Sequence, residues 1–119
     1  MSPIAWFKVD DHLYSHPKWL TLPKGARALW VTAGSWCSGQ LLDGFIPSGV
    51  LSMLGGTRSE AMHLVNNGLW REVKDGYRFH DWSAYQPTKK DVMDKRAKDA
   101  ERLRAWRERK DANRDEKGA

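Results

Sequence analysis

The sequence predicts a mainly helical α+β fold followed by a long charged C-terminal helix. Three observations lead to this fold class. Apolar residues recur at helical spacing through residues 24–38. Two short segments rich in aromatic and branched residues flank the turn pair Asp75-Gly76, which predicts a β-hairpin. After Pro87 most residues are charged, and residues 88–113 have the pattern of one long helix.

The first twenty residues predict a strand and a short helical segment. Residues 5–9 combine aromatic and branched side chains and favour a strand. Asp10-Asp11 then breaks it. Residues 13–14 and 17–20 indicate a turn or a short helix.

Residues 24–38 predict the principal helix of the domain. Its apolar residues fall at spacings that place them on one face: Leu29, Trp30, Ala33, Trp36 and Cys37. Gly39 is well placed to end the helix. We expect Cys37, the single cysteine, to be a small side chain of the core.

A second, short helix is expected after a link over residues 41–45, where Asp43-Gly44 predicts a turn. Pro47-Ser48 favours a helix start. The apolar face of this helix would consist of Val50, Leu51 and Leu54. Gly55-Gly56 would end it with a tight turn.

The sharpest local signal is the capping box Thr57-Arg58-Ser59-Glu60. The Thr57 hydroxyl can accept a hydrogen bond from the amide of Glu60, and the Glu60 carboxylate can accept one from the amide of Thr57. This predicts a helix over residues 58–67. Its inward face would hold Ala61, Leu64 and Val65. Its outward face would show Arg58, Ser59, Met62, His63, Asn66 and Asn67.

Residues 69–73 and 77–82 predict the two strands of the hairpin, joined by residues 74–76. In this hairpin Phe79 and Trp82 would face the core. His80-Asp81 would fix the end of the second strand, because no nucleophile motif accompanies the pair. The sequence therefore does not predict an enzyme.

This order of elements is that of a winged helix-turn-helix, in which the hairpin is the wing and residues 58–67 are the recognition helix. A helix N-terminus with Arg, Ser, Asn and neutral His side chains suits contacts with phosphates and base edges. We therefore expect double-stranded DNA as the partner. The predicted contacts on this domain are Arg58, Ser59, His63, Asn66 and Asn67 on the helix, with Lys74 and Arg78 on the wing.

Charge divides the chain into a head and a tail. Residues 1–88, the predicted winged-helix domain, carry eight basic and seven acidic residues, whereas residues 89–119 carry twelve and eight. The tail is predicted to be basic, helical and partly disordered. The basic residues that could follow phosphates are Lys89, Lys90, Lys95, Arg96, Lys98, Arg102, Arg104, Arg107, Arg109 and Lys110. Among these, Lys89, Lys90, Arg96 and Arg102 are the candidate DNA contacts.

Two other interpretations of the tail remain open. A solvated helix held by ion pairs along its surface would use Asp91 with Lys95, Asp94 with Lys98, and Glu101 with Arg104. Self-association would use a thin stripe of Val92, Arg96, Asp99, Leu103 and Trp106. The oligomeric state, monomer or homodimer, is therefore not determined.

Several classes of protein and site are not expected. No apolar run is long enough to span a bilayer, and the first residues lack the pattern of a signal peptide. One cysteine cannot form an internal disulfide, and the four histidines have no zinc-site spacing. We expect a cytoplasmic, nucleoid-associated protein without metal or cofactor.

The ordered set of short motifs resembles the N-terminal domain of phage replication-initiation and replisome-organiser proteins related to DnaD. The motifs are Trp6-Phe7-Lys8-Val9-Asp10, His16-Pro17-Lys18, Ala28-Leu29-Trp30, Asp43-Gly44-Phe45-Ile46-Pro47, Gly68-Leu69-Trp70, Tyr77-Arg78-Phe79-His80-Asp81-Trp82 and Tyr85-Gln86-Pro87. The resemblance covers about residues 4–88 and is greatest to tryptophan-rich versions from actinobacterial phages and prophages.

The resemblance implies a winged-helix module that binds DNA in phage replication initiation or phage gene regulation. By motif position it implies Arg58, Ser59, His63 and Asn66 in the recognition helix, and Lys74 and Arg78 in the wing. Larger members carry a further C-terminal domain, and only the basic tail follows here. The alternative is a protein-interaction module that binds a host or phage replication or transcription protein.

Overall fold

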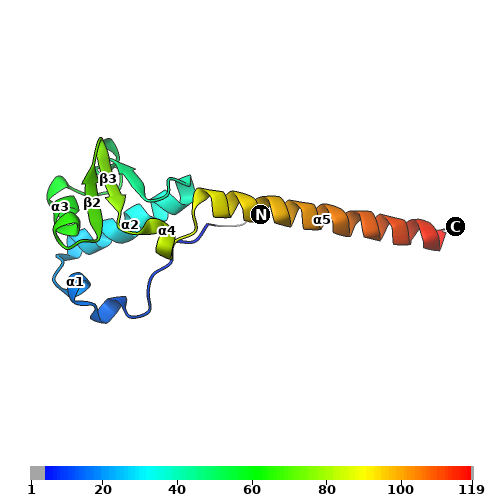
Figure 1. Cartoon of the computed structure of the whole chain (residues 1–119), viewed down its shortest axis with the longest axis horizontal. Coiled ribbons are helices and arrows are strands. Elements are labelled where there is room, and N and C mark those ends of the chain that lie inside the picture. The colour runs from blue at the N-terminus through cyan, green and yellow to red at the C-terminus, as the bar shows by residue number, and fades with distance from the viewer. Residues whose placement is uncertain (1–4, 119) are drawn as a thin grey trace.

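The structure, a computed structural model, describes residues 5–118 and the side chains of residues 5–114. The chain forms a head from which one long helix projects (Figure 1). The elements in chain order are η1 (Leu13–Ser15), α1 (Pro17–Leu20), α2 (Lys24–Gln40), β1 (Phe45–Pro47), η2 (Ser48–Val50), α3 (Arg58–Asn66), β2 (Trp70–Val73), β3 (Gly76–Phe79), α4 (Trp82–Tyr85) and α5 (Lys89–Gly118). The coarse prediction is confirmed as a mainly helical α+β fold with a long C-terminal helix. The predicted domain bounds at residues 1 and 119 lie outside the described residues.

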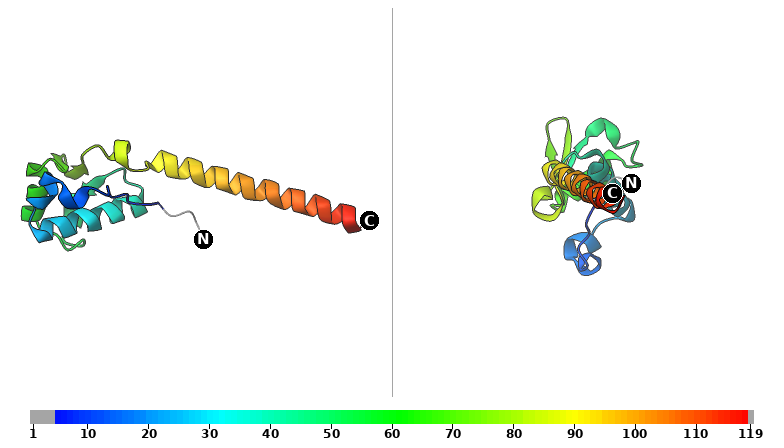
Figure 2. Two further views of the ribbon diagram at one scale, coloured as in Figure 1. Left: turned by 90° about the horizontal axis from the view of Figure 1, so that it is seen from below. Right: turned by 90° about the vertical axis from the view of Figure 1, so that its right-hand side faces the viewer.

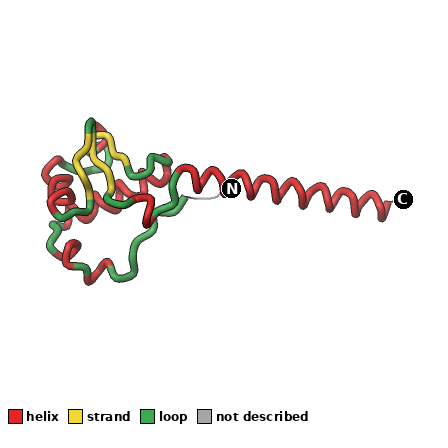
Figure 3. Tube along the Cα trace, in the orientation of Figure 1, coloured by secondary structure: helices red, strands yellow, loops and turns green. Residues whose placement is uncertain are grey.

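The predicted strand at residues 5–9 is wrong. This segment is extended, but no strand lies beside it, as the secondary-structure trace shows (Figure 3). The side chain of Gln86 takes the place of a neighbouring strand: Lys8 N donates to Gln86 Oε1 at 2.7 Å, and Gln86 Nε2 donates to Lys8 O at 2.6 Å. Strand propensity cannot form a strand without a backbone partner.

Helix α2 runs through the head and ends two residues after its predicted end. Ala26, Leu29, Ala33 and Cys37 are buried along one face. Gly39 lies inside the helix, and Leu41 ends it with a left-handed backbone, φ 56°. The amide of Leu42 then closes the end by donating to Cys37 O at 3.2 Å.

The segment after α2 contains a strand that the sequence analysis missed. Phe45–Pro47 forms β1, which pairs antiparallel with β3, although we expected a link and a helix start here. The predicted short helix is reduced to the 3-10 turn η2 and further turns up to Gly55. Gly55 has φ 78°, as the predicted tight turn requires.

The capping box of α3 is confirmed. Glu60 N donates to Thr57 Oγ1 at 3.2 Å, and Thr57 N donates to Glu60 Oε1 at 2.9 Å. Ala61 and Leu64 are buried against the core, as expected. Helix α3 packs against α2 and lies next to β2, so one face of it remains exposed.

The hairpin is confirmed, and β1 makes it a three-stranded sheet with the order β1-β3-β2. In the turn, Asp75 adopts the positive φ of 65°. Gly76 serves another purpose, because a Cβ there would collide with the backbone carbonyl of Ile46. The glycine therefore lets β1 approach β3.

The second strand ends earlier than predicted. Residues 80–82 were expected in the strand, but Asp81 has φ 52° and Trp82 begins α4. The left-handed residue turns the chain out of the sheet. Phe79 and Trp82 are nevertheless both buried, as expected.

Aromatic rings fill the core between α2, the sheet and α4. Phe79 lies at the centre of this group, with its ring centroid 5.4 Å from that of Trp70 and 5.2 Å from that of Trp82. Phe7 closes the group from the N-terminal segment, in edge contact with Trp30 at 4.9 Å. Each buried aromatic side chain removes a large area from water, so these rings dominate the burial in a small head.

Helix α5 begins with a second capping box and then leaves the head (Figure 2). Asp91 N donates to Thr88 Oγ1 at 3.1 Å, and Thr88 N donates to Asp91 Oδ2 at 3.0 Å. Lys89 N donates to Asp43 Oδ1 at 2.6 Å, which joins the helix start to the turn before β1. Among the residues whose side chains are described, Val92 is the last buried apolar one.

Candidate nucleic-acid interface

The exposed face of α3 carries four of the predicted contact residues. The side chains of Arg58, Ser59, His63 and Asn66 are all exposed. They share one helix, whose opposite face is anchored by Ala61 and Leu64, so their spacing is fixed by the core. Arginine, hydroxyl, imidazole and amide groups on one rigid face can donate to and accept from base edges and phosphates.

Two residues expected on this face have other positions. Asn67 Nδ2 donates to His63 O at 2.8 Å, and Thr21 Oγ1 donates to Asn67 Oδ1 at 3.0 Å. Asn67 therefore closes the end of α3 and ties it to the residue after α1. Met62 is half-buried and packs against the core. The expected position of Met62 and Asn67 on the outward face is therefore wrong, because both side chains are half-buried.

At the N-terminus of α3, the side chains of the capping box already accept hydrogen bonds from the amides of Thr57 and Glu60. The Glu60 carboxylate lies over the amide of Thr57, and a Cβ at Gly25 would collide with its other oxygen. Glu60 is thus turned toward the start of α2 and does not extend along the exposed face. The negative charge of the Glu60 carboxylate already interacts with the positive end of the α3 dipole. Any contact with a polyanion would therefore come from the exposed side chains of α3.

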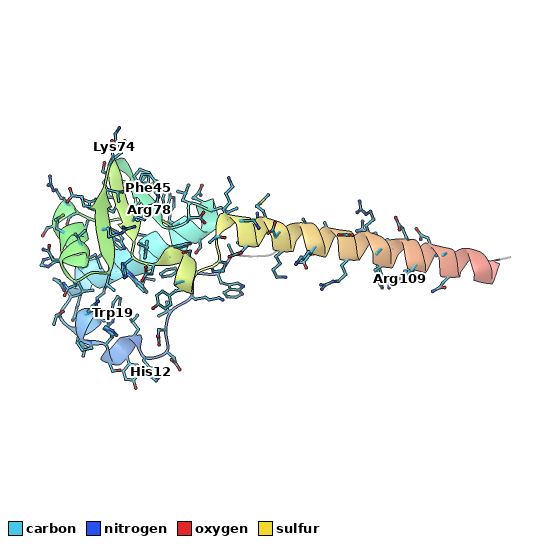
Figure 4. All side chains as sticks on the ribbon, in the orientation of Figure 1. His12, Trp19, Phe45, Lys74, Arg78 and Arg109 are labelled. Carbon is cyan, nitrogen blue, oxygen red and sulfur yellow. The ribbon has the colours of Figure 1, made fainter. Side chains whose placement is uncertain are left out.

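On the hairpin, Lys74 and Arg78 have different environments. Lys74 lies at the tip and points away from the head (Figure 4). Arg78 is half-buried: its Nη1 donates to Asp43 O at 3.3 Å, and its guanidinium lies 5.5 Å from the ring centroid of Phe45. The structure thus gives Arg78 a packing role within the sheet.

Arg71 was missed by the sequence analysis. It is exposed on β2, directly across from Arg78 on β3. Like charges directly opposite on one sheet face repel, so this pair raises the positive potential beside Phe45. Only the strand register could have revealed it, because seven residues separate the two arginines in the sequence.

The candidate contacts in the tail fall on different sides of α5. Lys89 and Arg102 are exposed, whereas Arg96 is half-buried. Lys90 Nζ lies 3.1 Å from Asp94 Oδ2, and Lys95 Nζ lies 3.0 Å from Asp99 Oδ2. The ion pairs expected between Asp91 and Lys95 and between Asp94 and Lys98 are not the ones that form, because Asp91 is used in the capping box and Asp94 pairs with Lys90.

Helices α3 and α5 lie at opposite ends of the head. Two views at right angles both show α3 at the end farthest from the point where α5 leaves (Figures 1 and 2). The molecule measures 71 Å along its longest axis. The tail therefore extends away from the exposed face of α3 and does not lie alongside it.

A cavity of about 410 Å³ lies between the N-terminal segment and the body of the head. Aromatic side chains form much of its lining, including Phe7, Trp19, Trp30, Phe79 and Trp82. His80 and Asp81 stand at its wall, with Nε2 and Oδ2 2.9 Å apart. Its size and mixed lining are those of a pocket for a small molecule or a partner side chain.

Two ionisable groups of the head, the Cys37 thiol and the Asp10 carboxyl, have shifted pKa values. Burial raises the pKa of the Cys37 thiol to about 12, although the nearby Arg78 acts in the opposite direction. A hydrogen bond from the backbone of His12 lowers the pKa of Asp10. Among the described residues, no group of three or more His, Cys, Asp or Glu side chains is arranged to hold a metal ion.

Comparison of the chain with protein families, with curated proteins and with solved structures gives no significant match. In the described part of the chain, no helix combines the length and apolarity needed to cross a membrane.

Proposed function

We propose that this chain is a DNA-binding winged-helix protein that acts in phage replication initiation or phage gene regulation. The observation that carries the proposal is the exposed polar face of α3, with Arg58, Ser59, His63 and Asn66 held at fixed spacing. Lys74, at the tip of the adjoining hairpin, supplies a second positive contact. Phosphate contacts would orient the head, and the α3 side chains would contact base edges.

The arrangement of the elements supports the winged-helix assignment. Helix α2, the turn η2, helix α3 and the hairpin follow one another in the expected order, with the unexpected strand β1 between α2 and η2. The main departure is η2, which replaces the first helix of the helix-turn-helix by a 3-10 turn. Gly55-Gly56 still provides the tight turn before α3, where a Cβ at Gly56 would crowd Leu29 of α2.

Fluorescence anisotropy with a mixed-sequence duplex at low and near-physiological salt tests this function. We expect Arg58→Ala and Lys74→Ala each to weaken binding by about fivefold, which corresponds to about 1 kcal/mol. Arg104→Ala, which removes the same charge from α5, is the matched control and should have a smaller effect. The absence of binding to any duplex at low salt by the folded full chain would refute the proposal.

A protein-interaction module is the second candidate, and the aromatic cavity favours it. Tyr85 lines this cavity and is 70% exposed, so a partner side chain could reach it. Capture from nuclease-treated lysate with the wild-type chain and with Tyr85→Ala tests this function. Recovery of the same proteins by both would argue against the cavity as a docking site.

A further inference from the structure

The distal part of α5 carries a basic surface centred on one tryptophan. Trp106 is 49% exposed, and Arg102, Leu103, Arg109 and Lys110 lie three or four residues from it, on the same side of the helix. Arg114 continues this side one turn beyond Lys110. We call these six residues the distal patch.

Side-chain contacts confirm that the distal patch is a continuous surface. Lys110 Nζ lies 4.9 Å from the ring centroid of Trp106, a cation–π contact. Open hollows border the ring, one lined by Arg109, Lys110, Asn113 and Arg114 and the other by Asp99, Arg102, Leu103 and Arg109. Arg109 projects from α5 into solvent (Figure 4).

Charge is segregated around this part of the helix. Helical periodicity places Glu101, Glu108 and Arg104 on the opposite side, with Arg107 and Asp111 toward the flank. Asp99 lies on the side of the distal patch, and its carboxylate pairs with Lys95. Ion pairs on α5 between described side chains join Lys90 to Asp94 and Lys95 to Asp99, both nearer the head. Among the residues whose side chains the structure describes, no ion pair involves the four cations of the distal patch, so their charge is available to a polyanion.

We propose that the distal patch is a binding site for unpaired nucleic-acid strand. Four unneutralised cations can follow a phosphate backbone, and the exposed indole can stack on a base. The bases of a duplex are already stacked on one another, and its phosphate surface offers no partner for an aromatic ring. An unpaired strand presents both groups at once, which is why it fits this surface better than a duplex.

Other partners fit the distal patch less well. A helix that lies in a membrane surface buries a continuous apolar face, and here only Leu103 and Trp106 are apolar on the basic side. A second copy of the chain would place two unneutralised basic surfaces against each other. Both remain as contrary outcomes of the test.

The site is separate from the α3 face, and the two can be tested independently. Because α3 and α5 lie at opposite ends of the head, the chain could hold a duplex at one end and a single strand at the other. This arrangement would suit a junction between paired and unpaired DNA. Binding of a duplex at α3 depends on the function proposed above, whereas binding of a single strand at the distal patch does not.

The test is fluorescence anisotropy of the full chain with labelled oligo-dT of about 15 nucleotides, a length in the range of known single-strand sites. Trp106→Ala should weaken this binding by about tenfold, as expected for the loss of one stacked base. Trp106→Phe should restore most of the affinity. Trp6→Ala is the matched control, because Trp6 is also exposed, at 67%, and belongs to the N-terminal segment and not to the distal patch.

Charge variants separate the distal patch from general electrostatics. Arg109→Ala should reduce the dependence of oligo-dT binding on salt, whereas Arg104→Ala, on the other side of α5, should change it less. Arg58→Ala should weaken duplex binding and leave oligo-dT binding intact. Circular dichroism of each variant checks that α5 is retained.

Two results would overturn the inference: wild-type affinity of Trp106→Ala for oligo-dT, or no binding of oligo-dT by the full chain. Binding to phosphatidylserine vesicles or dimer formation through Trp106, with oligo-dT ignored, would also overturn it and would identify the other partner. If oligo-dT binds through Trp106 while no duplex binds, the distal patch stands and the function proposed for α3 fails.

Discussion

Single polar side chains complete the hydrogen bonding of this small head. Gln86 satisfies both backbone groups of Lys8, and Asn67 closes the end of α3 while it accepts from Thr21. Asp91 accepts the amide of Thr88 at the start of α5. Each of these side chains replaces a backbone partner that a larger sheet or a longer helix would have supplied.

The capping role of Asp91 has a measurable pH dependence. The hydrogen bond from the Thr88 backbone amide, aided by the Thr88 hydroxyl, lowers the pKa of Asp91 below its ordinary value of 3.8. A depressed pKa stabilises the folded state fully above pH 3.8, and this stabilisation is lost as the pH falls through the folded-state pKa. The start of α5 should therefore loosen only in strong acid.

Titration by NMR of the Asp91 carboxyl carbon and the Thr88 amide checks this expectation. Both signals should move together, with a midpoint below 3.8. In the Thr88→Ala variant, which keeps the backbone donor and loses the hydroxyl, the midpoint should rise part of the way. A wild-type midpoint at or above the ordinary value would show that the capping box does not form in solution.

Burial makes the thiol of Cys37 unreactive in the folded chain. Its pKa of about 12, against an ordinary value of 9.0, lowers the fraction of reactive thiolate by about a thousandfold. Cys37 should therefore react with a disulfide reagent only after denaturation. Ser35→Cys in a Cys37→Ser background, with the thiol at an exposed position of the same helix, should react at once. Equal rates for the two thiols would contradict the burial of Cys37.

At the scale of elements, α2 uses its two later glycines in different ways. A Cβ at Gly34 would collide with the ring of Phe7, so this glycine lets the N-terminal segment pack closely on the helix. Gly39 has no heavy atom within 4 Å of the position of a Cβ. One glycine is thus required by packing, whereas the other only weakens the helix.

Substitution of these two glycines should change stability in opposite directions. Gly34→Ala should destabilise the head by about 1–3 kcal/mol, because Phe7 must leave its contacts with Trp30 and Trp82. Gly39→Ala should stabilise it by up to about 1 kcal/mol, since alanine favours the helix. Urea unfolding followed by tryptophan fluorescence measures both. Equal shifts of the two midpoints would show that Phe7 does not occupy this position.

At the scale of the whole molecule, the long helix α5 determines how extended the molecule is. The radius of gyration of the Cα atoms is 20.1 Å, whereas a compact chain of this length would have about 13–14 Å. The difference arises because α5 contacts the head near its start, through Lys89 and Val92, and then projects away from it. Surfaces at the two ends of the molecule are therefore well separated.

Small-angle X-ray scattering of the full chain should give a radius of gyration near 20 Å and a long tail in the distance distribution. The physical reason is that charge repulsion and the ion pairs along α5 favour an extended helix over one folded back on the head. Lys95→Ala, which removes one pair, should leave the value nearly unchanged. A radius near that of a compact chain would place α5 against the head.

Local chemistry was enough to predict the elements whose signals are contained within a few residues. The capping box at Thr57, the helix around Leu29 and the hairpin around Asp75 all appear where the sequence placed them. So do four exposed side chains of α3. The failures include β1, the supposed strand at residues 5–9 and the outward positions of Met62 and Asn67. Each of these depends on a partner that is distant in the chain.

The sequence by itself determined where α2, α3 and α5 start, where the hairpin turns, and that charge is concentrated in the tail, because capping, turn geometry and helical periodicity act between near neighbours. Only the tertiary structure decided that Arg78 packs on Phe45 beside Arg71, that an aromatic cavity opens beneath the N-terminal segment, and that α3 and α5 lie at opposite ends. These features depend on strand register and on the packing of segments far apart in the chain, which local preferences do not fix.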